Sequence, residues 1–308
     1  MDMRRLHHFA TVARTGNFTR AAELLYIAQP AISKSIQKLE EELQMQLFDR
    51  ADKHVSLTPE GRVLLGHAES ILERLDEARH EMQELRGLQR GEILLGLPSM
   101  FGSVYFPPII KAFIKQHPAL RLHVIEEGTV QIRQWITDKT IDLGIISYDP
   151  DVEAVHSNPE LMIEHLLTDE FVACFPQGHP LSTRSSISVQ ELLLEPLVLF
   201  KEGYNQRRLL DEASQQYGIQ PNIVFTTNQL SFIRSLVVEG VGATLLLRTA
   251  AAMEPRLAIV PIQPGISVHL AVAHRHNRYL SLANRAFLTF LKEQLVKLKY
   301  DHLPYRPS

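Results

Sequence analysis

The stretch AQPAISKSIQKLEEEL, residues 28–43, decides how the N-terminal part of this chain folds. Its large apolar residues recur at intervals of three or four positions: Ile32, Ile36, Leu39 and Leu43. This spacing predicts an amphipathic helix with one face in a core. Pro30 suits the first turn of such a helix, because an amide hydrogen there would have no partner within the helix.

The opposite face of this predicted helix carries groups that suit nucleic acid. Its polar side chains are Gln29, Ser33, Lys34 and Lys38. The Gln29 amide can donate to and accept from one adenine edge, and Ser33 can bond to a base or to a phosphate. The two lysines are placed to meet phosphates beside the groove. Simple solvation of a polar face is the alternative explanation for each lysine taken alone.

Residues 1–57 predict three short helices followed by a two-stranded wing. Leu6 and Phe9 begin the apolar stripe of the first helix, and Thr19 is placed to cap the second. The segment LFDRADKHVSL, residues 47–57, has two extended pieces around a turn. A third helix with a polar N-terminal end beside a wing is typical of the winged helix-turn-helix fold, in which that helix enters the major groove of DNA.

Three further side chains are candidate DNA contacts in this arrangement. Arg50 and Lys53 lie on or beside the wing, where a cation can reach the DNA backbone or the minor groove. Thr19, at a helix N-terminus, can offer its hydroxyl and backbone N–H groups to a phosphate. The net charge of the chain is −3 and gives no independent support, so DNA binding would depend on local charge placement.

A long amphipathic helix is predicted after the wing, with Thr58 as its cap and Pro59 in its first turn. Its apolar residues form a heptad seam: Leu64, Ala68, Ile71, Leu75, Ala78, Met82 and Leu85. A seam of this length favours a partner helix. We expect a second copy of the chain to cover it, through the large side chains Leu64, Ile71, Leu75, Met82 and Leu85. Packing of the seam on its own chain is the alternative.

Strands and helices alternate after the break GLQRGE at residues 87–92. This order predicts an α/β fold with a largely parallel sheet. The expected organisation is a winged helix-turn-helix DNA-binding domain (1–58), a linker and dimerisation helix (59–90) and a two-lobed effector-binding domain (91–300). Lobe I would comprise residues of about 91–165 and 267–300, and lobe II residues of about 166–266.

A ligand held by two joined α/β lobes binds between them, at the carboxyl ends of strands and the N-termini of helices. Loops of that kind supply the candidate effector-binding residues: Ser99, Met100, Phe101, Thr129, Tyr204, Asn205, Thr227 and Asn228. Helix N-termini and hydroxyl groups together favour a small anion such as a carboxylate. The apolar and aromatic members of the set leave a bulky aromatic or apolar effector as the alternative.

Residues 18–58 resemble the DNA-binding domain of the LysR-type transcriptional regulators. The matching residues are Ala21, Ala22, Leu24, Gln29, Pro30, Ala31, Ser33, Ile36, Leu39, Glu40, Leu43, Leu47, Phe48, Arg50, Leu57, Thr58 and Gly61. Weaker similarity covers most of the remaining chain. The resemblance implies a long dimerising helix and an effector domain similar to a periplasmic binding protein. It also implies effector contacts at Ser99 and Thr129, and tetramers that bend DNA.

Two positions depart from the pattern of this family. Gln44 follows the third helix where the family usually has glycine, which predicts a small local cost or a different helix ending. Leu247 stands where proline is common, so the shape of the cleft wall is left open. Neither change removes a proposed DNA contact.

Other functional classes find little support in the sequence. It lacks the motifs of serine hydrolases, P-loop enzymes and zinc peptidases, so we expect no catalytic residue. Its histidines lack partners at ligand spacing, so we expect neither metal nor cofactor. Cys174, the single cysteine, is expected to fill a core rather than to sense redox state. Without a signal segment, a cytoplasmic protein is expected rather than a periplasmic solute-binding protein.

The sequence therefore predicts a ligand-responsive, sequence-specific DNA-binding transcriptional regulator. It is expected to bind interrupted palindromic promoter sites as a dimer or a tetramer and to be switched by a small metabolite, an anion in the favoured interpretation. Its expected partners are double-stranded DNA, that effector, other copies of the chain and RNA polymerase, with no membrane contact. Activation and repression stay open alternatives.

Overall fold

The computed structural model describes residues 1–49, 55–85, 91–156, 158–276 and 279–301. The chain divides into two units, Met1–Leu88 and Gln89–Ser308, and each has its own core. Within the described part of the chain, no helix is both long enough and apolar enough to cross a membrane.

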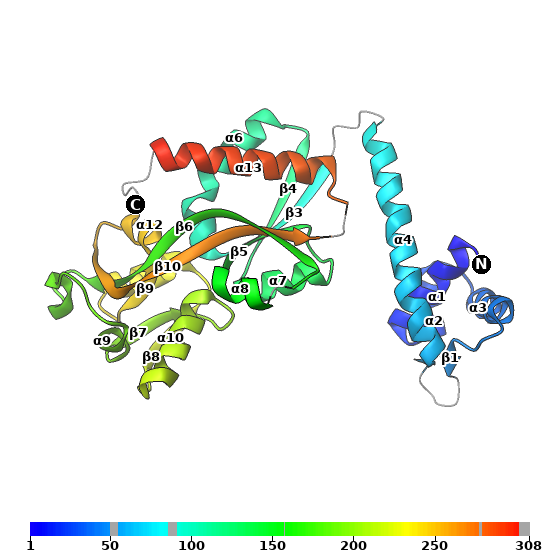
Figure 1. Ribbon diagram of the computed structural model, residues 1–308, viewed down its shortest axis with the longest axis horizontal. Coiled ribbons are helices and arrows are strands. Elements are labelled where there is room, and N and C mark those ends of the chain that lie inside the picture. The colour runs from blue at the N-terminus through cyan, green and yellow to red at the C-terminus, as the bar shows by residue number, and fades with distance from the viewer. Residues whose placement is uncertain (50–54, 86–90, 157, 277–278, 302–308) are drawn as a thin grey trace. The chain divides into compact units, whose positions relative to one another are not determined.

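The first unit has the element order of a winged helix-turn-helix (Figure 1). Its elements are α1 (Met3–Thr15), α2 (Phe18–Leu24), α3 (Gln29–Leu43), β1 (Phe48–Asp49), β2 (Ser56–Leu57) and α4 (Pro59–Leu85). The strands β1 and β2 pair antiparallel, with Phe48 opposite Leu57. The Phe48 ring lies beside Phe9 of α1, with ring centroids 5.3 Å apart, so the base of the wing packs into the helical core.

The cap of α2 differs from the expectation. Asn17, not Thr19, is the N-cap, and its Oδ1 accepts hydrogen bonds from the backbone N–H of Thr19 at 2.8 Å and of Arg20 at 3.1 Å. An asparagine side chain at this place satisfies amides that would otherwise lack a partner. The assignment of Thr19 as the cap was therefore wrong by two residues.

Gln44 adopts the conformation that glycine usually supplies. It ends α3 with φ 52° and ψ 35°, in the left-handed region. The helix ending expected for the family is therefore kept, and a residue with a Cβ accepts the local steric cost. The Glu40 side chain supports the loop that follows, because its Oε1 accepts a hydrogen bond from the Leu47 N–H at 2.8 Å.

The seam of α4 is shared between two environments. Ala68 is fully buried in the core of the first unit, and Leu64 and Ile71 pack against that core. Further along the helix Met82 is 55% exposed. Packing on its own chain therefore applies to the first half of the seam, and only the second half is left for another partner. Leu85 ends the helix, and its side chain lies outside the described residues.

The second unit is built on a mixed sheet of six strands in the order β4-β3-β5-β10-β6-β9. Their bounds are β3 (Gly91–Leu97), β4 (Leu120–Glu126), β5 (Leu143–Tyr148), β6 (Leu161–Pro176), β9 (Thr244–Leu247) and β10 (Leu257–Arg275). The strand β3 pairs parallel with β4 and β5, whereas β10 pairs antiparallel with β5 and β6, and β6 antiparallel with β9. A separate parallel pair joins β7 (Pro196–Phe200) to β8 (Asn222–Thr227).

The expectation of a largely parallel sheet was wrong, because β10 pairs antiparallel with β5 and β6, and β6 pairs antiparallel with β9. The two longest strands, β6 and β10, form the main antiparallel pair. They run side by side across the whole unit (Figure 1) and pair from Leu161 opposite Arg275 to Pro176 opposite Leu257. Polar residues such as Glu164 and Asp169 interrupt the apolar pattern of β6. A run of apolar residues in the sequence therefore indicates only the most buried part of each of these two strands.

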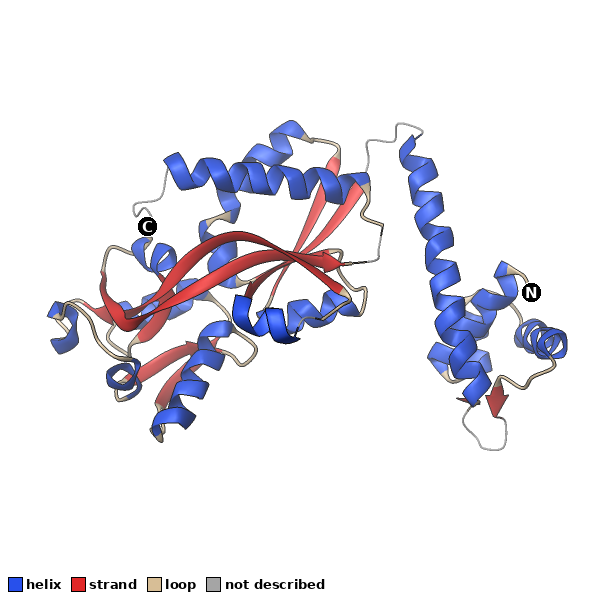
Figure 2. Cartoon of the chain, in the orientation of Figure 1, coloured by secondary structure: helices blue, strands red, loops and turns tan. Residues whose placement is uncertain are grey.

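Helices pack around the strands of the second unit (Figure 2). They are α5 (Ser99–Val104), α6 (Phe106–Gln116), α7 (Thr129–Thr137), α8 (Pro150–His156), α9 (Val189–Leu193), α10 (Asn205–Tyr217), α11 (Leu230–Val238), α12 (Arg248–Ala252) and α13 (Leu282–Asp301), with a 3-10 turn at Pro180–Thr183. Helices α5 and α6 meet at Tyr105. Phe113 of α6 packs edge-on against Phe287 of α13, with centroids 5.1 Å apart.

A buried carboxylate joins three elements of the second unit. Asp169 of β6 is 7% exposed and accepts hydrogen bonds from the hydroxyls of Tyr105, at 3.1 Å, and Thr249 of α12. Its other oxygen accepts from the Glu170 N–H at 2.8 Å. Burial and the nearby Asp169 raise the pKa of Tyr105 above its usual value, so the phenol stays protonated and donates. The network therefore ties the α5–α6 junction and α12 to the crossing strand.

Replacing Asp169 by alanine should remove the carboxylate that accepts from the buried Tyr105 and Thr249 hydroxyls and leave them only the 3.0 Å bond to one another. We expect the Asp169→Ala variant to lose about 2–4 kcal/mol of unfolding free energy in urea titrations followed by circular dichroism. Asp169→Asn should lose less, because an amide oxygen still accepts. Asp151→Ala, at an exposed position of α8, is the control and should unfold like the wild type. Equal stability of all the variants would show that the network contributes nothing.

Candidate DNA-binding surface and effector cleft

Helix α3 has two sharply different faces. Ile32, Ile36 and Leu39 are fully buried in the core of the first unit. Gln29, Pro30, Lys34 and Lys38 are exposed, and Ser33 is half-buried. The helix is therefore fixed by its apolar face, and its N-terminal turns present polar groups to the exterior.

The start of α3 is open to an acceptor. Its N-cap is Ala28, and no side chain of the described residues caps the first turn. Pro30 has no amide hydrogen and the Ala31 N–H donates to the Ala28 carbonyl at 2.9 Å, so the helix dipole and the exposed side chains are what this end offers an anionic group such as a phosphate. Gln29 Nε2 donates to Ser33 Oγ at 2.9 Å, so the two candidate base-reading side chains already lie within reach of one another. Both can exchange this bond for one to a base edge.

The acidic residues of α3 lie at its other end and are held by the chain itself. Glu42 pairs with Arg5 of α1 at 2.6 Å, and Glu41 accepts from the Gln37 amide at 3.0 Å. Together with the bond from Leu47 N–H to Glu40, these contacts hold the three carboxylates at the C-terminal end. The N-terminal end of α3 is therefore the face left for an anionic partner.

The remaining predicted DNA contacts are placed less completely. Thr19 is exposed in the first turn of α2, but Asn17 already accepts a hydrogen bond from its backbone N–H, so its hydroxyl is the group left to bind a phosphate. Arg50 and Lys53 lie outside the described residues.

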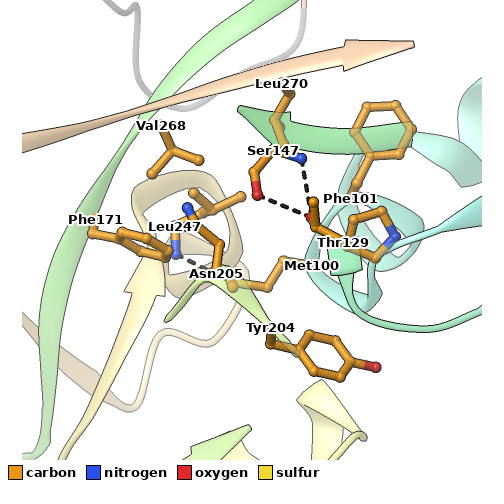
Figure 3. Close-up of a pocket in the computed structure, with 11 residues that line it drawn as sticks. Met100, Phe101, Thr129, Ser147, Phe171, Tyr204, Asn205, Leu247, Val268 and Leu270 are labelled. Carbon is orange, nitrogen blue, oxygen red and sulfur yellow. Dashed lines mark hydrogen bonds between the residues drawn. The ribbon is translucent and has the colours of Figure 1, made fainter. Parts of the chain in front are cut away.

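Two neighbouring cavities lie in the second unit where the effector cleft is expected. The inner cavity has a volume of about 30 Å³. Its walls include Met100, Phe101, Thr129, Tyr204 and Asn205 from the predicted set, and also Pro98, Ser147, Phe171, Leu247, Val268 and Leu270. Figure 3 shows that apolar side chains form most of this lining. A space of this size admits about one or two water molecules.

Thr129 and Ser147 form the polar part of the inner cavity (Figure 3). Their hydroxyls lie 3.0 Å apart, and Thr129 Oγ1 also accepts from the Ser147 N–H at 3.1 Å. Thr129 opens α7, whereas Ser147 lies near the carboxyl end of β5. Sequence reasoning missed Ser147, although the same rule of strand carboxyl ends would have found it.

Three predicted effector residues lie outside the linings of the two described cavities. Ser99 is 2% exposed, and its hydroxyl accepts from the N–H of Leu230, at the start of α11, at 3.4 Å. Thr227 accepts from the Gln229 N–H at 3.2 Å. Neither of them, nor Asn228, is among the residues that line the two described cavities. The Ser99 and Thr227 hydroxyls therefore satisfy backbone N–H groups at and just before the start of α11, and a role of either in binding an effector stays a prediction.

The outer cavity is larger and charged. It has a volume of about 270 Å³ and shares Thr129, Ser147, Tyr204 and Asn205 with the inner one. Its other lining residues are Val130, Arg133, Tyr148, Asp149, Val152, Glu153, Gly203 and Arg208. Arg133 pairs with Glu153 at 2.8 Å, and Arg208 with Glu212 at 2.8 Å. Sequence reasoning missed both arginines, because they lie one turn inside α7 and α10 rather than in loops.

Tyr204 stands between the two cavities as a hydrogen-bond donor. Burial and the nearby carboxylates of Glu127 and Glu126 raise the pKa of Tyr204 above its usual value, so its phenol stays protonated. The hydroxyl is buried and meets no partner at hydrogen-bonding geometry among the described residues. Its ring stacks on Phe200, with centroids 4.8 Å apart.

Two loops that each contain a glycine meet beside the cavities. A Cβ on Gly128, at the start of α7, would lie 2.5 Å from the carbonyl oxygen of Gly203, which precedes α10. The Val130 N–H donates to that same oxygen at 3.4 Å. Because no side chain fits between them, the two loops can touch only while residue 128 is glycine.

The described residues also bear on metal binding and on thiol chemistry. Among the residues that the structure describes, no group of three or more potential ligands is placed to hold a metal ion. Cys174 is fully buried in β6, and burial raises the pKa of its thiol to about 12. The thiol is therefore protonated and packs as a core side chain.

Comparisons with known proteins agree along the whole chain. Residues 3–62 match the family model "Bacterial regulatory helix-turn-helix protein, lysR family", and residues 86–296 match "LysR substrate binding domain". The uncharacterised HTH-type transcriptional regulator YwbI of Bacillus subtilis (strain 168) is 30% identical over 98% of this chain and 99% of its own.

Solved structures share this fold. HinK, a LysR family transcriptional regulator from Pseudomonas aeruginosa, is 26% identical with a TM-score of 0.55, over 96% of this chain and 99% of HinK. Full-length CbnR, solved with its target DNA, is 20% identical with a TM-score of 0.56, over 96% and 100% of the two chains. The second likeness concerns the fold alone.

The contact between Gly128 and Gly203 can be tested in solution. In Gly128→Ala the added Cβ should push the two loops apart, and hydrogen–deuterium exchange should quicken in residues 127–130 and 201–205 together. Gly265→Ala is the control, because a Cβ there meets nothing within 4 Å. Unchanged exchange at residues 201–205 would mean that the loops do not touch in solution.

Proposed function

This chain belongs to the LysR family of bacterial transcriptional regulators, and on that basis we propose how it recognises DNA and how an effector switches it. It is a ligand-responsive transcriptional regulator with a DNA-binding helix-turn-helix. Its relatives are transcriptional regulators rather than enzymes, and the proposal assigns no catalytic step to any residue. The cytoplasm is its proposed location, because its proposed partner is DNA.

The N-terminal end of α3 is proposed to enter the major groove of interrupted palindromic promoter sites. The observation that carries this proposal is the open first turn of α3, with Gln29 and Ser33 paired on its exposed side and Ile32 and Ile36 buried on the other. Gln29 and Ser33 would read base edges, while Lys34, Lys38 and the Thr19 hydroxyl would position the helix on phosphates.

A homodimer or homotetramer is proposed as the DNA-binding form. An interrupted palindrome needs two recognition helices related by symmetry. The exposed second half of the α4 seam, with Met82, is the proposed contact between copies. The edge strand β4 exposes Val124, and the β8–α11 region exposes Phe225 and Phe232, so the second unit offers further apolar surface for assembly. Contact with RNA polymerase would follow from DNA binding and is part of the proposal.

The two adjoining cavities are proposed as the effector site. Arg133 and Arg208 at the outer cavity favour an effector with an anionic group, although each now pairs with a carboxylate that the effector would have to displace. The inner cavity, with Phe101 and Phe171, also favours an apolar or aromatic part. Because the inner cavity holds only a water or two, an effector there must first separate the lobes.

The switch is proposed to act through the relation between the lobes. An effector that binds one arrangement of the lobes better than another shifts the protein toward that arrangement. If that arrangement holds the paired DNA-binding units differently, the bend of the DNA changes. Such coupling is reciprocal, so DNA must change effector affinity by the same factor as effector changes DNA affinity.

Replacing Gln29 by alanine should remove a base contact. With a duplex from upstream of the protein's own coding region, we expect Gln29→Ala to weaken binding about tenfold to a hundredfold in fluorescence anisotropy, with little change on a shuffled duplex. Gln37→Ala, on the same helix with its amide bound to Glu41, is the matched control and should bind like the wild type. If the wild type and Gln29→Ala bound both duplexes equally, the upstream fragment would not contain the target sequence. If a genome-wide selection then found no other target sequence, the proposal would be refuted.

Assembly through α4 predicts a charge-sensitive dimer. Met82→Lys would place an ammonium group in the proposed apolar contact and should raise the dimer dissociation constant by at least about tenfold in sedimentation equilibrium. Leu194→Lys is the control, because Leu194 is 71% exposed next to α9 and is not part of the seam. If Met82→Lys and the wild type had the same apparent mass at every protein concentration, the seam would not hold the copies together.

A further inference from the structure

Tyr26 is the most exposed large apolar side chain that the structure describes. It lies in the turn between α2 and α3, three positions before Gln29, and 95% of its surface is accessible. A tyrosine gains most of its contribution to stability from burial of its ring. This ring gains almost none from its own unit.

The backbone of Tyr26 is also unfavourable for a residue with a side chain. Its φ is 54°, in the left-handed region. The Ile27 N–H bonds to the Ala22 carbonyl at 3.1 Å, and the Tyr26 N–H bonds to the Glu23 carbonyl at 3.2 Å. This pair of bonds is the Schellman ending of a helix, whose left-handed position is most often glycine because a Cβ is strained there.

Two other non-glycine residues among those described share this conformation, Gln44 and Lys139. Both have long polar side chains that are well solvated when exposed. Tyr26 differs because it combines the backbone cost with an exposed aromatic ring. Non-glycine residues held in this region cluster at binding sites, where another interaction accounts for them.

We propose that the Tyr26 hydroxyl donates a hydrogen bond to a DNA backbone phosphate beside the N-terminal end of α3. The inference rests on the proposed function, since it takes α3 as the recognition helix. A residue in the turn just before this helix would lie near the strands that border the groove, where phosphates are the dominant acceptors. A neutral phenol can donate to a phosphate without adding charge, and its ring can cover the adjoining sugar.

The test uses the full-length protein and two duplexes, the upstream promoter fragment and its shuffled version, by fluorescence anisotropy at several salt concentrations. Tyr26→Phe should weaken binding to both duplexes by the same factor, about threefold to tenfold, because a phosphate contact carries no sequence information. The slope of affinity against salt should stay the same, because no charge is removed. Tyr217→Phe, an exposed tyrosine of α10, is the control.

A second variant separates a DNA contact from a structural role. Tyr26→Gly removes the side chain and relieves the strained backbone, so it should weaken DNA binding at least as much as Tyr26→Phe. At the same time the thermal unfolding temperature should stay equal to that of the wild type or rise by a few degrees. A lowered unfolding temperature would show that Tyr26 supports the fold instead, and would overturn the proposal.

The remaining outcomes also decide the question. Unchanged affinity of Tyr26→Phe for both duplexes overturns the proposal, and a loss confined to the promoter duplex replaces the phosphate contact with a base contact. If the wild type does not prefer its promoter and Gln29→Ala changes nothing, the proposed promoter recognition fails. The role of Tyr26 is still decided by the shuffled duplex in that case, because phosphates are present in any sequence. A wild type that binds neither duplex refutes both.

Discussion

The hydrogen-bond ladder between β6 and β10 supports the whole second unit. It extends from Leu161 opposite Arg275 to Pro176 opposite Leu257, with register shifts near Pro261 and Leu270. Because β5 adds to one side of this pair and β9 to the other, both lobes are built on the same two strands. A change in the relation of the lobes must therefore bend or twist this ladder. Asp169 lies in β6, so its hydrogen bonds to Tyr105 and Thr249 connect this ladder to α5, α6 and α12.

The first unit depends on a different constraint, because one short helix must both complete a core and present a polar surface. Ile32 and Ile36 hold α3 in place, which leaves its first turn free of intramolecular caps from the described residues. The carboxylates of α3 lie at its far end, where Glu42 pairs with Arg5. The same division of one helix into two ends explains how a chain with net charge −3 can offer a site for DNA.

The cleft combines two environments that few small molecules satisfy together. Its inner part is walled mainly by apolar groups and contains the Thr129–Ser147 pair, whereas Arg133 and Arg208 line the outer part. The proposed effector, with a compact apolar part and an anionic end, would match both once it displaced Glu153 and Glu212 from the two arginines. The loops of Gly128 and Gly203 touch beside the cavities, so under the proposed function entry of such a molecule would be coupled to movement of these loops.

The sequence by itself determined the fold class and both amphipathic helices, because helical periodicity and turn residues act over a few neighbouring positions. It also identified Met100, Thr129 and Asn205 at the cleft, since the ends of strands can be located from the same local pattern. Only the tertiary structure decided that Ser99 binds the N–H of Leu230 and that Ala68 is buried on its own chain. The length of β6 and β10 was settled there too. These features depend on contacts between groups that are far apart in the sequence. A local pattern of apolar and polar residues does not show which distant groups come into contact.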